Sequence, residues 1–407
     1  MRMILVSDSF PPVKNSAAVL IFSLAEALAS LGHEVLVITP SVDINKSFSV
    51  DEVETFKVLR ILCGKIKSHN KFIRGMSELS LFFKLPLQFK KTPYAEIQWD
   101  IVIWYSPSIF LSGLIKYLCK KSLHRYLILR DIVPDWMVDV GIMKKGPSYH
   151  LLKWFERYQY RLADVIGIQS LGNRRYIESQ NLPKLQKLEV LNNWMPSISI
   201  TQSLSAPHSS SINLKNTILN NRKVFIYAGN LGEAQGIEDL ANAILLTKLE
   251  SDIGFLIIGR GSKKQWLQNF ITLHEIGNVL ILDEVELPAL SAYYRQCYAG
   301  IVFLNASHQS HNIPGKFISY LEASLPVIAC VNPGNDLVKI ITEEGLGIVA
   351  KDSREFSIKL LEFSNQINFD VFPGSKRARD YYEKHYQPLA AAKQILNSFL
   401  APEIEMH

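Results

Sequence analysis

The chain has 407 residues, of which 48% are hydrophobic and 20% are charged, and its formal net charge is +6. This composition excludes a wholly disordered chain, and the length is more than one hydrophobic core usually supports, so we expect two domains of about 200 residues each. No uncharged apolar run reaches the ~18 residues of a membrane span, and the four scattered cysteines are typical of idle thiols in a reducing cytoplasm.

In the first half of the chain, short apolar runs alternate with helix-length segments. Residues 4–6 predict a strand, the apolar spacing of residues 20–31 predicts a helix, and residues 34–38 predict the next strand, which makes one βαβ unit. Further strands are predicted at residues 101–105, 126–129, 165–168 and 188–191. Residues 1–196 are therefore predicted to form a Rossmann-like domain with a parallel sheet.

A Ser- and Asn-rich segment, residues 197–222, is predicted to be a linker, after which the alternation restarts. Strands are predicted at residues 224–227, 255–258, 279–282, 301–304, 327–330 and 348–350. Residues 223–375 thus predict a second Rossmann-like domain, and the helical tail of residues 376–407 is expected to cross back onto the first domain. The predicted fold class is α/β, with two doubly wound parallel sheets facing a deep cleft.

The positive charge is concentrated in residues 57–91, which contain nine basic residues and one acid, Glu78. These cations interleave with the apolar residues 79–89, a pattern that suits the surface of an anionic bilayer. A buried helix with a solvated basic side explains the same pattern. Nucleic acid is a weaker alternative, because no recognised nucleic-acid-binding motif accompanies the basic residues.

Loops that directly follow parallel strands are where ligands bind in such sheets. The loop after the first strand contains Lys14, Asn15 and Ser16 at a predicted helix start, followed by small residues that would let backbone N–H groups approach an anion. An ordinary strand-to-helix turn with Ser16 as the N-cap is the alternative.

Glycines follow two successive strands of the second half, in residues 227–236 and 258–261. Glycine permits the backbone to wrap closely around a phosphate or a base. Arg260 stands between the two glycines of the second segment, where it could pair with phosphate oxygens or lie in solvent.

The most specific segment runs from His311 to Lys316. Asn312 is expected as an N-cap and Pro314 at the first helical position, so Lys316 falls in the first turn of the helix. A helix start favours anions, so a lysine there is tolerated chiefly next to a bound anion such as a diphosphate. A solvated surface lysine is the alternative.

Charged and amide residues also follow strands of the first half. Arg130 and Asp131 leave one strand and Asn193 leaves another, so they are expected to face the cleft between the domains. They could bind an acceptor hydroxyl or close a structural ion pair. The histidines have no metal-ligand spacing and no Asp-x-Asp motif is present, so no tightly bound metal ion is predicted.

With these loops, the chain resembles the retaining glycosyltransferases of family four, which have the B-type fold of two Rossmann-like domains. The similarity rests on residues 10–12, 31–35, 229–236, 258–261 and 326–329, in the expected order. The chain also departs from the family. Its usual pair of glutamates aligns with His311 and Ser319, and its usual Arg and Lys align with Asn230 and Gln235.

Together these substitutions resemble a subgroup, the WbuB-type N-acetyl-L-fucosamine transferases of bacterial O-antigen or capsule assembly. The resemblance implies a UDP-linked deoxyamino sugar as donor and a polyprenyl-diphosphate-linked saccharide as acceptor. The basic stretch of residues 57–91, with no predicted membrane span, adds the expectation of a cytoplasmic protein at the inner face of the membrane. The resemblance implies no protein nucleophile, because the leaving phosphate would accept the acceptor's proton. A non-catalytic partner subunit and a nucleotide-sugar 2-epimerase are the alternatives.

The expected site residues form three groups. The catalytic group is Lys316, Arg260, Asp131, Arg130 and His311. The donor-binding group is Gly229, Asn230, Leu231, Gly232, Gln235, Gly259, Asn312, Ile313, Pro314, Gly315 and Ser319. The acceptor-side loop residues are Lys14, Asn15, Ser16 and Asn193.

Overall fold

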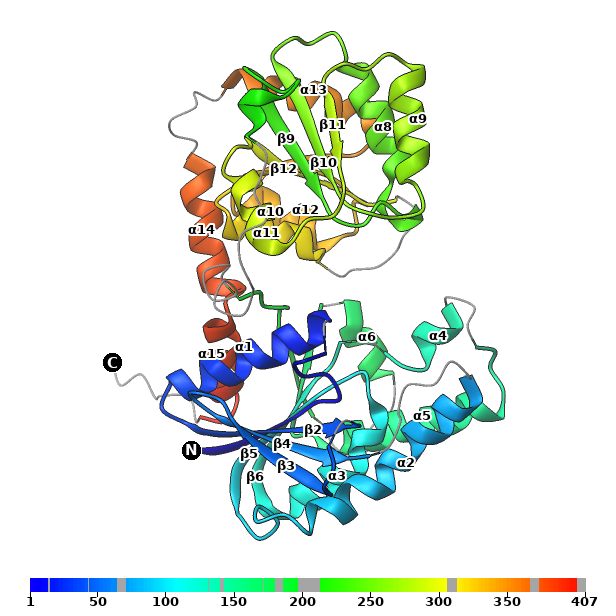
Figure 1. Ribbon diagram of the computed structural model, residues 1–407, viewed down its shortest axis with the longest axis vertical. Coiled ribbons are helices and arrows are strands. Elements are labelled where there is room, and N and C mark those ends of the chain that lie inside the picture. The colour runs from blue at the N-terminus through cyan, green and yellow to red at the C-terminus, as the bar shows by residue number, and fades with distance from the viewer. Residues whose placement is uncertain are drawn as a thin grey trace. The chain divides into compact units, whose positions relative to one another are not determined.

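The computed structural model describes residues 1–13, 15–42, 44–63, 71–130, 132–139, 143–170, 172–179, 186–196, 213–305, 313–366 and 373–400. The chain divides into two compact units (Figure 1). The first contains Met1–Asn193 and Pro388–His407, and the second contains Trp194–Gln387. His311, Asn312, Lys14 and Asp131 lie outside the described residues, and nothing is stated about their contacts.

The first unit is built on an eight-stranded sheet of order β3-β4-β2-β1-β5-β6-β7-β8. Its strands are β1 (Arg2–Val6), β2 (Glu34–Ser41), β3 (Phe48–Glu52), β4 (Lys57–Leu62), β5 (Trp99–Tyr105), β6 (Ser122–Ile128), β7 (Val165–Ile168) and β8 (Lys187–Val190). All pairs are parallel except the β3–β4 hairpin at the edge. The sequence analysis does not predict this hairpin, because the apolar residues of 57–62 come in adjacent pairs and do not alternate with polar ones.

Helices cover the first sheet. They are α1 (Ser16–Ser30), α2 (Lys71–Phe89), η1 (Ile109–Leu111), α3 (Ser112–Leu118), η2 (Cys119–Lys121), α4 (Asp135–Asp139), α5 (Pro147–Leu162), α6 (Gly172–Glu178) and α15 (Pro388–Asn397). The N-cap of α1 is Asn15 and not Ser16, because the extended Asn15 places its side-chain oxygen 2.8 Å from the Ala18 amide. Between α14 (Pro373–His385) and α15 the chain passes from the second unit to the first, so the tail expected as one helix consists of two.

The second unit has a six-stranded, fully parallel sheet of order β11-β10-β9-β12-β13-β14. Its strands are β9 (Lys223–Ala228), β10 (Ile253–Ile258), β11 (Val279–Leu282), β12 (Ala299–Phe303), β13 (Val327–Cys330) and β14 (Gly347–Ala350). The strand order reverses between β9 and β12, which makes their carboxyl ends the switch point where such sheets bind ligands.

Helices on both faces bury the second sheet (Figure 1). They are η4 (Leu214–Asn216), η5 (Glu233–Gln235), α8 (Ile237–Leu246), α9 (Lys264–Leu273), α10 (Leu287–Tyr294), α11 (Gly315–Glu322), α12 (Asp336–Glu343), α13 (Ser353–Gln366) and α14 (Pro373–His385). Strands such as β10 are buried along their whole length, as expected where helices cover both faces of a parallel sheet. None of the described helices in the chain is long and apolar enough to cross a membrane.

Candidate functional site

The loop after β9 lies against the loop after β10, and glycines make this contact possible. A Cβ atom on Gly259 would lie 1.9 Å from the Gly229 carbonyl oxygen, and one on Gly261 would lie 2.4 Å from the Leu231 carbonyl oxygen. The Leu231 amide donates to the Arg260 carbonyl at 2.8 Å. The two glycine segments found in the sequence therefore lie in direct contact, and a larger residue at Gly259 or Gly261 would clash with the neighbouring backbone.

Left-handed backbone also accounts for two glycines of this loop. Gly229 has φ +143° and Gly236, the N-cap of α8, has φ +58°. An L side chain at either position would strain the backbone. The loop thus leaves β9 and reaches α8 through conformations that glycine supplies.

Helix α11 follows β12 on the other side of the switch point, and Lys316 is in its first turn as expected. Pro314 is the N-cap and not the first helical residue, because its ψ of 137° is extended. Among the described residues, the amides of Gly315 and Lys316 have no hydrogen-bond partner, whereas the Phe317 amide donates to the Pro314 carbonyl. Free amides at a helix start are donors for an anion.

Lys316 joins the two sides of the switch point. Its Nζ donates to Gln235 Oε1 at 3.0 Å and lies 3.7 Å from the centre of the Tyr227 ring, and its Cε would lie 3.4 Å from a Cβ on Gly229. No carboxylate pairs with it in the part of the chain that the structure describes. Burial in these surroundings lowers the pKa of Lys316 to about 7.

Arg260 occupies a different environment. Its side chain is 82% exposed and its Nε lies 2.9 Å from the Glu284 carboxylate. The side chain thus lies in solvent in this structure, and its expected pairing with phosphate oxygens remains a prediction. Arg260 is paired with an acid rather than held next to Lys316.

Sequence reasoning missed Lys263, which follows the second glycine segment. Its amide donates to the Leu231 carbonyl at 2.8 Å, and its Nζ lies 2.6 Å from Glu238 and 3.2 Å from Glu233. These bonds, first the one to Glu238, raise the pKa of Lys263. Lys263 therefore holds the glycine loop to α8, and its position beside Gly261 was the available signal.

Tyr320 also escaped the sequence reasoning, which treated it as an ordinary member of the apolar face of α11. Its buried hydroxyl accepts from the Ala228 amide at 3.0 Å and donates to the Ile301 carbonyl at 3.2 Å. Space for the ring comes from Gly300, where a Cβ would lie 2.2 Å from it. Tyr320 thereby ties the end of β9 to β12 beneath the glycine loop.

Ser319 and Glu322 face the interior of the second unit. Ser319 Oγ donates to the Gly315 carbonyl and lies 3.3 Å from the Met195 sulfur. Glu322, which is 8% exposed, lies 3.5 Å from the Arg379 guanidinium. Ser319 therefore contacts the helix packing in this structure, and its expected role at the donor remains a prediction.

In the first unit, Arg130 is buried and binds backbone carbonyl groups. Its guanidinium donates to the carbonyl oxygens of Leu191 at 2.9 Å and Asn192 at 3.2 Å, which holds the chain as it leaves β8. The half-buried Asn193 follows directly. Asn15 Nδ2 donates to Ser9 Oγ at 3.3 Å, so the structure gives Arg130 and Asn15 roles in organising loops at the ends of β8 and β1.

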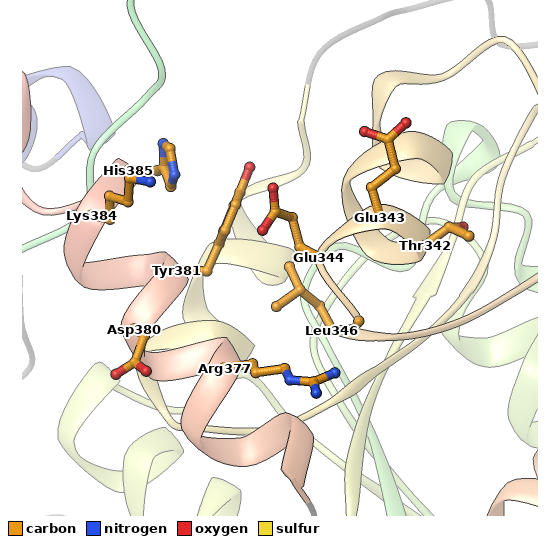
Figure 2. Close-up of a pocket in the computed structure, with 10 residues that line it drawn as sticks. Thr342, Glu343, Glu344, Leu346, Arg377, Asp380, Tyr381, Lys384 and His385 are labelled. Atoms are coloured by element: carbon orange, nitrogen blue, oxygen red, sulfur yellow. The ribbon is translucent and has the colours of Figure 1, made fainter.

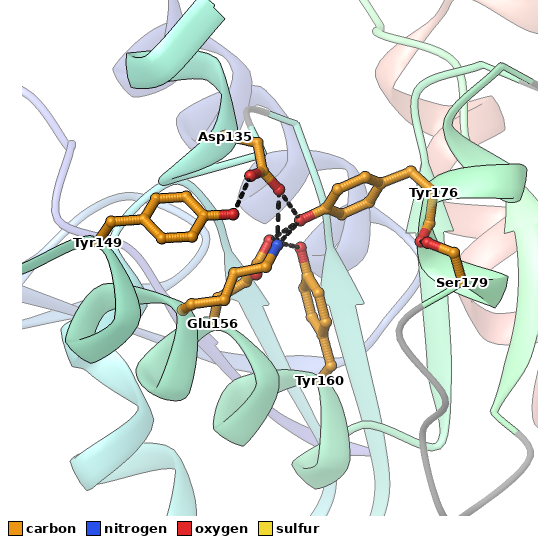
Figure 3. A network of polar contacts seen from close by, with 7 residues as sticks. Asp135, Tyr149, Glu156, Tyr160, Tyr176 and Ser179 are labelled. Carbon is orange, nitrogen blue, oxygen red and sulfur yellow. Dashed lines mark hydrogen bonds and ion pairs between the residues drawn. The ribbon is translucent and has the colours of Figure 1, made fainter. Parts of the chain in front are cut away.

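An ion network of the first unit was not singled out from the sequence (Figure 3). Lys153 Nζ lies 2.6 Å from both the Asp135 and Glu156 carboxylates, and Tyr149 donates to Asp135 at 2.6 Å. Tyr176 donates to Glu156 at 2.6 Å and also contacts Asp135. The network ties α4 and α6, which follow β6 and β7, to α5.

The two carboxyl groups of this network respond to it in opposite directions. Burial would raise the pKa of Asp135, but hydrogen bonds from Lys153, Tyr149 and Tyr176 outweigh that effect and lower it. Burial raises the pKa of Glu156, which is fully buried, in spite of Lys153. In this network one cation, Lys153, pairs with both carboxyl groups, and its role is structural.

A hollow of about 610 Å³ opens between α14 and the end of α12 (Figure 2). Tyr381 of α14 points toward Glu344 there, and Arg377, Asp380 and Lys384 add charges of both signs. None of the residues expected from the sequence lines this hollow. Among the described residues, no group of three or more His, Cys, Asp or Glu side chains could hold a metal ion.

Comparison with known families identifies the region that contains the glycine loop and Lys316. Residues 222–366 match the family described as glycosyl transferases group 1. The chain is similar to the group 1 glycosyl transferases over these residues. The loop after β9, the loop after β10 and α11 all lie within the matched residues.

The similarity to known proteins extends beyond residues 222–366. The chain is 25% identical over 225 residues to the probable glycosyltransferase WbjE of Pseudomonas aeruginosa, which is 54% of each chain. It is 23% identical over 338 residues to the putative colanic acid biosynthesis glycosyl transferase WcaI of Escherichia coli K12, covering 79% of this chain and 81% of the relative.

The structural likeness covers nearly the whole chain. WaaG, a glycosyltransferase involved in lipopolysaccharide biosynthesis, aligns over 97% of this chain and 99% of its own with a TM-score of 0.59. At 13% identity, this likeness shows the fold alone. The fold is GT-B, with two parallel-sheet α/β domains, as the sequence predicts.

Proposed function

We propose that the protein is a glycosyltransferase that moves a sugar from a nucleotide diphosphate donor to a saccharide acceptor in surface polysaccharide synthesis. The observation that carries the proposal is Lys316, a cation without a carboxylate partner among the described residues, placed over the glycine loop at the switch point of the second sheet. The family match of residues 222–366 supplies the reaction class.

The electrostatics of the Lys316 site favour a diphosphate. Desolvation penalises the ammonium form of Lys316, and a bound dianion would remove that penalty. The amides of Gly315 and Lys316, at the positive end of α11, are further donors for phosphate oxygens. A site of this kind binds an anion more strongly as its negative charge grows, which is what a leaving diphosphate requires.

In the proposed reaction, the bond between the anomeric carbon and the diphosphate oxygen breaks, and the electron pair leaves with the diphosphate. The acceptor hydroxyl forms the new bond on the same face of the sugar, and its proton passes to the leaving phosphate. Lys316 stabilises the leaving charge, so no protein nucleophile is needed. Retention of configuration is part of this proposal and rests on the family resemblance.

The sugar and the acceptor follow from the resemblance to WbuB-type enzymes. We propose a UDP-linked N-acetyl-L-fucosamine or a related deoxyamino sugar as donor, and a polyprenyl-diphosphate-linked saccharide as acceptor, as in O-antigen or capsule assembly. The similarity to WcaI, a putative colanic acid biosynthesis glycosyl transferase, and to WaaG, which is involved in lipopolysaccharide biosynthesis, supports this proposal. No tightly bound metal or other cofactor is part of the proposal.

A thermal-shift screen of the purified protein against nucleotide sugars tests the donor. A true donor raises the melting temperature by mass action, and we expect UDP-linked sugars to do so. The same ligands should raise the melting temperature of Lys316→Ala much less. Lys248 is exposed and far from Lys316 in the sequence, so Lys248→Ala should respond as the original protein does. Equal shifts in Lys316→Ala would show that Lys316 does not bind the diphosphate.

A non-catalytic partner subunit is the second candidate, favoured by one observation. Ser319 stands where the family has a glutamate, and its hydroxyl is turned toward Gly315 and Met195. Donor binding without turnover on any lipid-linked acceptor would support this candidate. Release of UDP with transfer of the sugar would exclude it.

A further inference from the structure

Aromatic side chains of α2 and α5 form a continuous strip on the first unit. The Phe82 ring lies 5.1 Å from Phe155 and 6.0 Å from Tyr158, and Tyr158 stacks on Trp154 at 5.3 Å. Trp154 is 53% exposed, and Phe83, next to Phe82, is 59% exposed. Exposed apolar side chains that adjoin one another in this way are typical of a surface that binds a partner or a membrane.

Helical spacing extends the strip along both helices. Leu87, which is 59% exposed, lies one turn after Phe83 on α2, and Leu151, which is 50% exposed, lies one turn before Trp154 on α5. The opposite side of α2 packs inward through Leu81. We call Phe82, Phe83, Leu87, Leu151, Trp154 and Tyr158 the α2–α5 strip.

The exposed charges around this strip are mostly positive, and the exposed acid near its α3 side, Glu96, is paired with Lys121 at 2.7 Å. Lys116 of α3 lies 5.8 Å from the Tyr158 ring, and Lys90 lies 5.5 Å from the ring of Tyr117, also on α3. The acids of α2 and α5, Glu78 and Glu156, are half-buried and fully buried. The exposed cations of these segments are Lys84, Lys90, Lys91, Lys116, Arg157 and Arg161.

We propose that the α2–α5 strip docks on the surface of an anionic phospholipid bilayer. Tryptophan and tyrosine rings partition into the headgroup region, leucine and phenylalanine reach the acyl boundary, and lysine and arginine pair with the lipid phosphates. A partner protein would need an acidic rim of matching shape, whereas a bilayer supplies negative charge along the whole face. Charge complementarity therefore favours lipid as the occupant.

This surface differs from the basic stretch predicted at residues 57–91. Lys57 and Arg60 belong to β4, and Arg60 bonds to Asp51 and to the Pro11 carbonyl, so it is already neutralised. The two interpretations of this stretch, a bilayer-binding surface and a buried helix with a solvated basic side, each describe one side of α2. Its outer side is exposed and belongs to the strip, and its inner side is buried. The second half of the surface comes from α3 and α5, which lie beyond the stretch.

Co-sedimentation of the full chain with lipid vesicles tests the proposal. We expect binding at low salt to vesicles of phosphatidylcholine mixed with phosphatidylglycerol, little binding to phosphatidylcholine alone, and release at high salt. The double variant Lys84→Gln with Lys116→Gln should bind the anionic vesicles about 30-fold more weakly. Trp154→Ser should bind about tenfold more weakly, because the ring no longer enters the headgroup region.

Matched variants in the second unit are the controls. Leu273→Ser removes a side chain that is 77% exposed, and Lys215→Gln with Lys248→Gln removes two exposed cations, so both should bind vesicles within about twofold of the original protein. Equal binding to neutral vesicles would overturn the proposal, as would equal losses in the control variants. Self-association that Trp154→Ser abolishes would assign the strip to a second copy of the chain and would also overturn it.

Calorimetry with UDP separates this proposal from the proposed function. The α2–α5 strip variants should bind UDP as the original protein does. A protein that binds anionic vesicles but not UDP would contradict the proposed donor site and leave the docking surface supported.

Discussion

Lys153 in the first unit and Lys316 in the second are both desolvated cations, but their partners differ. Lys153 lies between two carboxylates at 2.6 Å each, whereas Lys316 has an amide oxygen and an aromatic ring. Burying an ammonium is costly unless an anion neutralises it. Lys153 therefore completes a structural network. Lys316 has no carboxylate partner among the described residues, and this difference is the basis for its proposed role at the donor.

Removal of Lys153 tests the structural half of this comparison and should have the largest effect. Lys153→Met leaves Asp135 and Glu156 facing each other without a cation, so we expect the free energy of unfolding to fall by about 3–5 kcal/mol. Urea denaturation followed by circular dichroism measures it. The triple variant with Asp135→Asn and Glu156→Gln should recover part of the loss, and a loss of under about 1 kcal/mol in the single variant would contradict the pairing.

Removal of Lys316 should have the opposite pattern. Lys316→Met is expected to weaken UDP binding about 10- to 100-fold, the effect of a lost charge-assisted hydrogen bond, and near pH 7 to raise the free energy of unfolding, because it removes the cost of burying an ammonium. Calorimetry and urea denaturation give the two numbers. Lys264→Met is the matched control, because Lys264 already pairs with Asp283, and its UDP affinity should change by less than about threefold.

The pH dependence sharpens the same contrast. The pKa of Lys316 is lowered from 10.5 to about 7 in the free protein, and a bound diphosphate would raise it again. UDP binding at pH 8 should therefore take up a proton, and the affinity should fall as the pH rises above 7. Calorimetry in two buffers of different ionisation enthalpy detects the uptake, and Lys316→Met should abolish it.

The same shift affects stability with a definite sign. Between pH 7 and 10.5 the unfolded chain holds a proton on Lys316 that the folded chain has released. The destabilising contribution of this group is therefore complete below pH 7 and disappears as the pH rises to 10.5. The difference in unfolding free energy between the original protein and Lys316→Met should follow this trend, and a pH-independent difference would contradict it.

Tyr320 should have a smaller effect, on stability alone. Tyr320→Phe removes the hydroxyl that pairs the Ala228 amide with the Ile301 carbonyl, so we expect the free energy of unfolding to fall by about 1–2 kcal/mol. Tyr386→Phe is the matched control, because its buried hydroxyl has no hydrogen-bond partner in the described part of the chain. A larger loss in Tyr386→Phe than in Tyr320→Phe would contradict this assignment.

Arg260 should have the smallest effect. Its exposed side chain pairs with Glu284, and exposed pairs contribute only ~0–1 kcal/mol, so Arg260→Gln is expected to weaken UDP binding by less than about threefold. Calorimetry under the conditions used for Lys316→Met makes the comparison direct. A loss equal to that of Lys316→Met would show that Arg260 leaves Glu284 for the diphosphate.

Local patterns account for what could be predicted from the sequence. The alternation of apolar runs and helical segments gave the two parallel sheets, and the glycine segments gave the loops that pack together at Gly229 and Gly259. Lys316 could be placed in a first turn because Pro314 and Gly315 precede it closely. Pro314 was expected at the first helical position, but the structure has it one position earlier, at the N-cap. Sequence patterns do not resolve the single backbone angle on which this boundary depends.

Long-range contacts account for what was missed. Lys153, Asp135 and Tyr176 lie on three helices, and their local surroundings are those of ordinary surface residues, so only packing shows that they meet. The same holds for Tyr320, whose hydroxyl reaches Ala228 across the unit. The α2–α5 strip likewise joins residues that are far apart in the sequence.

The sequence by itself determined the fold class, the glycine loops and the presence of a cation at the start of α11, because hydrophobic period, glycine and helix-end signals act over a few residues. The tertiary structure decided which cations are already neutralised. Neutralisation depends on carboxylates brought from distant segments, and this is why Lys153 and Arg260 have their acids, while Lys316 has a ring and an amide.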